Sequence, residues 1–408
     1  MRANHKPQPE GRDIGSPPVA LFALAVGVVV LSLYASQPLV GIIGPEIGLS
    51  PVTSGLATTL TLLGYSAGLF LLVPLTDLSE NRTLILATLA GNVCALLTLA
   101  AAPTAAVFLS MSFLVGLSTS AIQMLVPIAA SLSSEARRGR AIGNVMSGLM
   151  LGILFSRPLA SLVTEAAGWR LLYAILAGAV AVLALGLARF IPTIRPAGKS
   201  SYMQLIGSLG LILRQEPILR HRAATQAMCM CAFGVFWTAI ALRLAQPPIS
   251  LGQMGMALFA FAGAAGAIIS PIAGWAGDRG ATRPATMLAH ASVIVAMILA
   301  YFGGCAFTGN RATSLVTLLT AAILLDLGVI ADQTLGRRAI NLLRPEARGR
   351  INGLFTGLFF IGGAAGSALS GVAWSMWGWE GVCASGLTFG ISAIVIFLLG
   401  YRATEARP

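Results

Sequence analysis

Ionisable side chains that interrupt long apolar stretches are the residues of this chain best suited to chemistry. Asp326 lies in the apolar sequence Ala-Ile-Leu-Leu-Asp-Leu-Gly-Val, and Arg157 follows Gly-Ile-Leu-Phe-Ser. A carboxylate in such surroundings can load and release a proton, and a guanidinium there can bind an anion or neutralise a carboxylate. We therefore predict Asp326 as a proton-coupling residue, with Arg157 as a second candidate.

Each of these residues also has a structural alternative. Asp326 could be hydrogen-bonded to neighbouring helices for packing alone, and Arg157 could extend its charge to the outer membrane surface. Extension to that surface is the favoured interpretation for Arg243. Asp332, which precedes Arg337 and Arg338 by a few residues, is best explained by a salt bridge.

The stretches around these residues are too apolar for a water-soluble protein. Hydrophobic side chains make up 56% of the 408 residues and charged ones only 10%, against about 25% charged residues in a soluble domain. This composition excludes a soluble enzyme and a free nucleic-acid-binding protein. The five cysteines have no paired spacing, and the histidines do not cluster (His5, His221 and His290), so we expect no disulfide framework, no metal site and no cofactor.

The length of the uncharged runs indicates many membrane-spanning helices, each of which needs about 20 mainly apolar residues. The run of 52 uncharged residues between Arg82 and Glu135 must cross twice, with a turn at Pro103. The first run follows basic residues and could be a secretory signal, but eleven further spans favour a retained helix. The predicted spans are 18–40, 52–75, 84–102, 104–131, 141–164, 169–191, 224–245, 252–276, 284–307, 313–336, 350–374 and 379–401.

The basic residues predict how these spans are oriented. With the amino terminus inside, only three of the 26 cations fall in outer loops (Arg170, Arg243 and Arg311) and Arg157 falls within a span. The positive-inside rule then places both termini in the cytoplasm. This distribution explains the net charge of +12 without a nucleic-acid partner, and the inner cations could contact anionic lipids.

Short segments recur about half a chain apart, which indicates an internally duplicated bundle. The segment around Asp77 and Arg82 aligns with that around Asp278 and Arg283 at an offset of 201 residues. Glu-Ala-Arg-Arg-Gly-Arg at 135–140 matches Glu-Ala-Arg-Gly-Arg at 346–350, and Gly168-Trp matches Gly378-Trp. We therefore predict an all-α membrane protein of two pseudo-symmetric six-helix bundles, divided into a tail (1–17), a first bundle (18–192), a cytoplasmic linker (193–222), a second bundle (223–401) and a second tail (402–408).

With twelve spans, a basic central loop and the sequence Gly274-Trp-Ala-Gly-Asp-Arg-Gly-Ala-Thr-Arg283, the chain resembles the major facilitator superfamily. Strings such as Tyr34-Ala-Ser-Gln-Pro-Leu resemble a bacterial branch of drug or metabolite exporters. The resemblance implies a gating role for the two loops, in which a carboxylate binds an arginine or caps a helix when the halves close on the inner side. The alternative is a role in topology alone. The gating candidates are Asp77, Arg82, Gly274, Asp278, Arg279 and Arg283.

The resemblance also implies that spans 1, 4, 7 and 10 line a central cavity. Polar and aromatic residues on those spans suit an amphipathic or weakly polar organic substrate, although each taken singly could be a helix-packing residue. The cavity candidates are Tyr34, Gln37, Gln123, Trp237 and Gln333.

Two positions depart from the proton-coupled drug antiporters of this superfamily. Ser112 stands where they usually carry an arginine, four residues before Gly116, and Arg157-Pro158 replaces a glycine-rich pattern in span 5. Both differences weaken the transfer of the drug-antiport mechanism and leave the fold prediction untouched.

The function expected from these features is secondary transport of a small organic molecule, by alternating access, across a bacterial inner membrane. Proton-coupled efflux is the first expectation, with proton-linked uptake of a sugar or organic acid as its alternative. A membrane sensor or intramembrane enzyme ranks lower because no catalytic set is visible. The sequence Gly-x-x-x-x-Gly-Lys-Ser/Thr is absent, so an ion or solute gradient must supply the energy. One chain holds both halves, so a monomer would suffice.

Overall fold

The computed structural model describes residues 16–50, 52–195, 201–306, 309–344 and 347–405, and these segments form helices without any strand. The expected amino-terminal tail up to residue 15, with His5, lies outside the described residues. So do linker residues 196–200 and residues 406–408 at the carboxyl end.

The first half of the chain folds into helices whose apolar runs were visible in the sequence. Short 3-10 segments continue two of them, η1 (Gln37–Leu39) and η2 (Val73–Asp77). The helices α4 and α5 end and begin on either side of the turn expected at Pro103. The α-helices of this half are α1 (Ser16–Tyr34), α2 (Val40–Glu46), α3 (Leu56–Leu71), α4 (Asn81–Ala100), α5 (Ala105–Thr119), α6 (Ala121–Ser131) and α7 (Glu135–Ala188).

The second half repeats this plan after a connecting helix, α8 (Tyr202–Gln215). A 3-10 segment, η3 (Phe261–Gly263), joins two helices into one span, and a π-helical turn, η4 (Phe302–Ala306), ends another. The remaining helices are α9 (Pro217–Ala245), α10 (Gln253–Ala260), α11 (Ala264–Asp278), α12 (Thr282–Tyr301), α13 (Arg311–Asn341) and α14 (Arg348–Glu405).

Two of the helices are long enough to cross a membrane twice and are broken in the middle. Among the described residues, ten helical stretches have the length and apolarity of a membrane span, and two of these contain 52 and 53 residues. In α7 the break is Gly168 (φ 82°, ψ 158°) and in α14 it is Gly378 (φ 60°, ψ −149°). Only glycine adopts such backbone angles readily. The two breaks turn ten stretches into twelve spans, as the sequence predicts.

Small residues allow the helices within each half to approach closely, as they do in membranes generally. A side chain at Gly148 would collide with the backbone of Ala23, and one at Gly366 with the backbone of Cys231. These contacts join α1 to α7 and α9 to α14, which are equivalent pairs in the two halves. Gly143 of α7, in contrast, faces open space.

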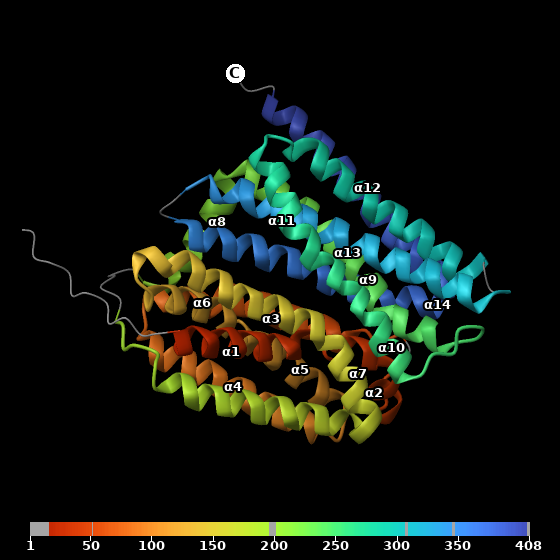
Figure 1. Ribbon diagram of the computed structural model, residues 1–408, viewed down its shortest axis with the longest axis horizontal. Helices are drawn as coiled ribbons and strands as arrows, with labels where there is room; N and C mark the ends of the chain where they lie inside the picture. Colours follow the sequence, from red (N-terminus) through yellow and green to blue (C-terminus); the bar gives the residue numbers. More distant parts are fainter. Residues whose placement is uncertain (1–15, 51, 196–200, 307–308, 345–346, 406–408) are drawn as a thin grey trace, which may run out of the picture.

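The two halves lie side by side with their helices roughly parallel, as Figure 1 shows with the first half in red to yellow and the second in green to blue. One end of the molecule carries α8, and we call it the α8 end. The other carries α2 and α10, and we call it the α2 end. At the α2 end the halves touch, because a methyl group at Gly41 would lie 3.2 Å from Leu242 Cδ2. Thr59 Oγ1 of α3 also donates a hydrogen bond to the Ala364 carbonyl of α14.

The segment expected as the linker is largely helical. Its sequence from 193 to 222 contains all of α8 and the first six residues of α9. The Ser201 amide donates to Gln204 Oε1 at 2.9 Å, which stabilises the start of α8. Arg222, expected in an aqueous linker, is instead buried inside the second half.

Candidate functional site

Asp326 occupies a buried position in the middle of α13, and Trp237 of α9 is its hydrogen-bond partner. The indole Nε1 donates to Asp326 Oδ1 at 2.8 Å, and the side chains are 2% and 5% exposed. A buried carboxylate needs such donors because it has lost its contact with water. The other carboxylate oxygen, Oδ2, faces Gly263 of η3.

Arg157 of α7 is equally buried and is held by polar and aromatic contacts. Its Nε donates to Gln37 Oε1 at 2.8 Å. Its guanidinium carbon lies 4.2 Å from the centroid of the Trp237 ring, 5.1 Å from that of Tyr34 and 5.2 Å from that of Phe233. Cation–π contacts of this kind are strongest where water is excluded. Arg157 and Tyr34 belong to the first half and both other rings to the second, so this contact joins the halves.

Arg157 and Asp326 face the same small space from opposite halves without forming a direct ion pair. A methyl group at Gly263 would lie 3.1 Å from Asp326 Oδ2 and 3.6 Å from Arg157 Nη1. Trp237 contacts both residues, the carboxylate through its N–H and the guanidinium through its ring. Among the described residues, Arg157 Nη2 and Gln37 Nε2 are buried donors without a protein acceptor. They remain available to a polar group that enters this space.

A cavity of about 760 Å³ begins at this pair and extends to the α8 end. Its wall includes Arg157 and Asp326 at one extreme and Asp278 and Arg348 at the other. A second space of about 1060 Å³ adjoins it near Asp77. The cavity is therefore open toward the α8 end and closed where the halves meet at the α2 end.

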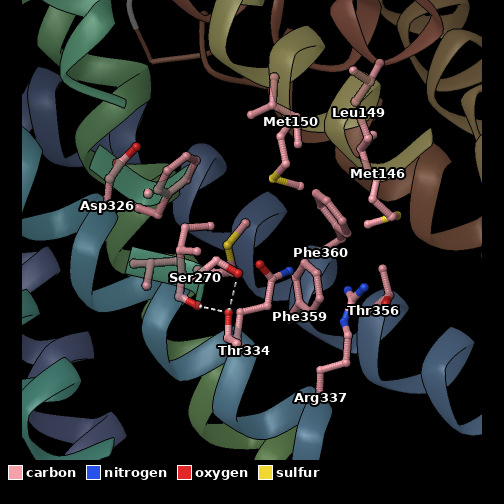
Figure 2. Close-up of a pocket in the computed structure, with 18 of the residues that line it drawn as sticks. Met146, Leu149, Met150, Ser270, Asp326, Thr334, Arg337, Thr356, Phe359 and Phe360 are labelled. Atoms are coloured by element: carbon pink, nitrogen blue, oxygen red, sulfur yellow. Dashed lines mark hydrogen bonds between the residues drawn. The ribbon is translucent and has the colours of Figure 1, made fainter. Parts of the chain in front are cut away.

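The cavity wall combines apolar and polar surfaces. Figure 2 shows Met146, Leu149 and Met150 of α7 across the space from Ser270 and Thr334, which are hydrogen-bonded to each other. Phe359 and Phe360 of α14 lie between them, with ring centroids 4.6 Å apart. A pocket of this size and character suits a small organic molecule better than an ion.

The five cavity candidates occupy two different kinds of position. Tyr34, Gln123 and Gln333 are part of the cavity wall, and the Gln123 amide donates to the Tyr65 hydroxyl at 3.1 Å. Gln37 and Trp237 lie behind the wall, where they hold Arg157 and Asp326. Tyr65, Phe359, Phe360 and Arg337 also line the wall, although the sequence did not single them out for it. Arg337 and Arg338 were expected only as salt-bridge partners of Asp332.

The gating candidates cluster at the α8 end. Arg338 Nε donates to Asp278 Oδ1 at 2.9 Å, so in this conformation the second acid binds an arginine of its own half. Arg279 stacks over Trp275 at 3.9 Å. Asp77 ends η2 and faces the adjoining space. The other candidates lie in helices that flank the loops, Arg82 in α4, Gly274 in α11 and Arg283 in α12.

Asp332 forms its salt bridge with a residue other than the expected one. Its Oδ1 lies 3.3 Å from Arg222 Nη2 and 3.3 Å from His290 Nε2, whereas Arg337 and Arg338 point elsewhere. All three side chains are at most 5% exposed. The expected salt bridge therefore exists but joins α13 to α9 and α12. Its formation explains why Arg222 can be buried at all.

A possible metal-ligand set lies in the same cluster. Single ligand atoms of Cys229, His290 and Asp332 lie within 4.8 Å of one another, although the spacing of the histidines in the sequence gave no sign of it. The guanidinium of Arg222 already supplies the positive charge beside Asp332. A metal cation would be repelled by that guanidinium, so the cluster is better explained as a structural ion pair.

Arg243 does not extend to the membrane surface as expected. It is 5% exposed, and it donates to the carbonyls of Gly304 and Pro247 at 2.9 and 3.1 Å. Gly304 belongs to the π-helical turn η4, whose carbonyls lack regular helical partners. Arg243 therefore stabilises an irregular helix end.

The family of the chain follows from comparison with known proteins. Residues 22–242 match the model of the Major Facilitator Superfamily. The chain belongs to the major facilitator superfamily. It is 34% identical over 388 residues to the uncharacterized transporter YgaY of Escherichia coli O157:H7, a match that covers 95% of this chain and 96% of YgaY. The proteins it resembles are membrane transporters, and none of the similarities indicates a catalytic activity.

Solved structures of this superfamily share the fold across nearly the whole chain. The nucleoside transporter NupG superposes with a TM-score of 0.75 at 13% identity, covering 94% of this chain and 99% of NupG. An inward-facing, unoccupied bacterial homolog of the human lysosomal transporter Spinster superposes with a TM-score of 0.70 at 14% identity, covering 94% and 95%. At these identities the similarity establishes that this protein has the same fold, and it says nothing about the substrate.

Proposed function

We propose that this protein exports a small organic molecule from the bacterial cytoplasm in exchange for protons, with Asp326 as the coupling residue. The observation that carries the proposal is the pair formed by Asp326 and Arg157 at the closed end of the cavity. A carboxyl group there lies on the substrate path and can carry a proton across the membrane. Arg157 comes from the opposite half, so its attraction to Asp326 depends on how the halves are arranged.

The coupling follows because a proton and the guanidinium of Arg157 compete for the carboxylate of Asp326. When Asp326 is charged, the nearby guanidinium of the other half is attracted to it and stabilises the closed α2 end, while the indole N–H holds the carboxylate in place within its own half. When Asp326 is protonated, the electrostatic attraction between the halves falls and opening toward the α2 side costs less. Proton binding therefore biases the two-state equilibrium that alternating access requires.

The side from which the cavity is reached follows from the orientation of the chain. We place the α8 end in the cytoplasm because the basic loops and the connecting helix lie there. The cavity is then inward-facing and can load a substrate from the cytoplasm. Both termini are cytoplasmic in this orientation, the two bundles are 18–192 and 223–401, and a monomer contains the complete path. The gating loops at the α8 end would close the cavity when the halves rock.

The test is the accumulation of toxic and fluorescent organic compounds in an efflux-deficient host. Wild type, Asp326→Asn and an empty vector are compared at equal expression, with and without an uncoupler. We expect lower accumulation with the wild-type protein only, and we expect the uncoupler to abolish the difference. Export that survives Asp326→Asn would remove Asp326 from the coupling mechanism, and growth dependent on an imported nutrient would instead identify uptake.

A further inference from the structure

Arg337 is a charged group of the cavity wall that the proposed coupling mechanism does not use. It lies on α13 and faces the cavity on the same helical face as Asp326 and Gln333. Eleven residues separate it from Asp326, which is about 16 Å along a helix. Arg337 and Asp326 are therefore too far apart to neutralise each other directly.

The acids of the cavity wall already have other partners. Among the described residues of that wall, the acids are Asp326 and Asp278. Asp326 is bound by Trp237 and faces Arg157, while Asp278 is bound by Arg338. Over the described part of the chain, no ion pair involves Arg337. A half-buried guanidinium without a carboxylate favours an anion from outside the protein.

Polar groups around Arg337 fit the same kind of ligand. The Tyr65 hydroxyl lies within electrostatic reach of the guanidinium. Its oxygen accepts a hydrogen bond from Gln123 at 3.1 Å, so its own O–H remains free to donate. Figure 2 shows the Arg337 side chain directed toward Thr356, another hydroxyl in the wall. Two hydroxyl donors beside a guanidinium make a binding site for an oxyanion.

The wall beside these polar groups is apolar and fits a hydrophobic body. Phe360 packs edge-on against Tyr65 with 4.8 Å between ring centroids and lies 4.6 Å from Phe359. Met146 and Met150 face these rings across the cavity (Figure 2). Methionine and phenylalanine adapt to varied apolar shapes and offer nothing to an inorganic ion. A cation would be repelled by Arg337, and a small inorganic anion would leave this apolar surface unused.

We propose that the substrate of this cavity is an amphipathic organic anion, with a carboxylate, sulfonate or phosphate bound by Arg337 and Tyr65. Its apolar part packs against Phe359, Phe360 and the methionines of α7. The inference rests on the proposed function, because it assigns the cargo of that same cavity. It differs from a topological role for Arg337, which would make the charge of a ligand irrelevant.

The test compares three ligands that share a naphthalene ring and differ in charge. Naphthalene-1-sulfonate is a permanent anion, its sulfonamide is neutral, and 1-naphthylmethylamine is a cation at neutral pH. Apparent Kd values come from the ligand-induced thermal shift of the purified full-length protein. The sulfonate is expected to bind the wild type at least about tenfold more tightly than the sulfonamide, as a charge-assisted contact would give.

Variants of Arg337 test whether this residue causes the preference for the sulfonate over the sulfonamide. Arg337→Gln is expected to lose it, so that sulfonate and sulfonamide bind alike, and Arg337→Lys should retain part of it. Arg189→Gln removes an exposed charge at the end of α7, outside the cavity wall, and should change nothing. If Arg337→Gln fails to fold, the partial loss expected in Arg337→Lys takes its place beside the wild-type comparison, and an unchanged preference in that variant would overturn the assignment to Arg337. Equal or weaker binding of the sulfonate by the folded wild type would overturn the inference.

Transport of the same sulfonate separates this inference from the proposed function. Proteoliposomes with an imposed pH gradient are expected to move it, since a permanent anion does not cross the bilayer alone. Arg337-dependent binding without gradient-driven movement would remove proton coupling and leave the anion site standing. Gradient-driven transport of the amine or the sulfonamide in preference to the sulfonate would remove the anion site and leave proton coupling standing.

Discussion

The guanidinium of Arg157 lies 4.2 Å from the centre of the Trp237 ring, across the boundary between the two halves of the protein. The same indole donates its N–H to Asp326 at 2.8 Å. One side chain therefore connects the cation of the first half to the carboxylate of the second. In the proposed mechanism, this arrangement would make the closure of the α2 end depend on the charge of Asp326, which is the link that proton coupling needs.

Trp237 offers a way to separate its two contacts. Trp237→Phe keeps an aromatic face for Arg157 and removes the donor to Asp326, whereas Trp237→Leu removes both. A desolvated cation–π contact is worth about 2 kcal/mol, so Trp237→Leu should lower the closed population at the α2 end by roughly tenfold or more. Trp237→Phe should lower it much less.

The closed population can be measured by a disulfide between Gly41→Cys and Leu242→Cys, made after the native cysteines are replaced. These positions face each other across the halves at the α2 end, with 3.2 Å between a methyl group at Gly41 and Leu242 Cδ2. The rate of crosslinking should be highest with Trp237 and lowest with leucine. Equal rates in all three proteins would show that the aromatic contact does not hold this end closed.

Asp326→Asn should abolish coupling while leaving the site assembled. The asparagine carbonyl can still accept the Trp237 N–H, so the fold and its thermal stability should change little. The amide cannot take up a proton, so transport driven by an imposed pH gradient should fall to the level of empty liposomes. Counterflow of the substrate without a gradient should persist. Loss of counterflow together with normal folding would indicate that Asp326 binds substrate and does not couple protons.

The positions of the spans could be predicted from the sequence because apolar runs mark the helices that cross the membrane and glycines mark the breaks between paired spans. The predicted span 224–245 ends with α9, and Gly168 and Gly378 break α7 and α14 at the residues that the internal repeat aligned. The lipid solvent dictates an apolar residue at nearly every outward position, so composition alone limits where a helix can cross.

The partners of the charged residues could not be predicted, since they depend on contacts between distant parts of the chain. Arg222 pairs with Asp332, 110 positions away, while its sequence neighbourhood looks like an aqueous linker. Arg337 and Arg338 are adjacent in sequence, yet a helix turns about 100° between them. Both reach the cavity wall, but only Arg338 binds Asp278. Helical periodicity places Arg337, but not Arg338, on the same face of the helix as Asp326. It could have distinguished the two arginines if it had been known that Asp326 faces the cavity.

The ion pair between Arg222 and Asp332 should matter more to stability than to transport. Removing one partner leaves a buried charge uncompensated, so Asp332→Asn should cost about 3–5 kcal/mol. The double variant Arg222→Met/Asp332→Leu removes both charges and should recover a large part of that loss. Thermal unfolding of the purified variants measures both values. A double variant less stable than Asp332→Asn would show that the cluster contributes more than charge neutralisation, for example through the Arg222 contact to Thr286.

A side chain at Gly168 or Gly378 should destabilise the protein, because both residues have positive φ values at the sharp turns between paired spans. Neither position lacks space, since a methyl group at either would touch nothing within 4 Å. The cost of Gly168→Ala or Gly378→Ala is therefore one of backbone strain, about 1–3 kcal/mol for each residue. Gly178→Ala is the matched control, because Gly178 is helical, equally open and in the same helix as Gly168. This substitution should be neutral or slightly stabilising. Thermal unfolding in one detergent compares the three variants, and a loss of stability in Gly178→Ala equal to that in Gly168→Ala would attribute the effect to helix packing instead of to the turn.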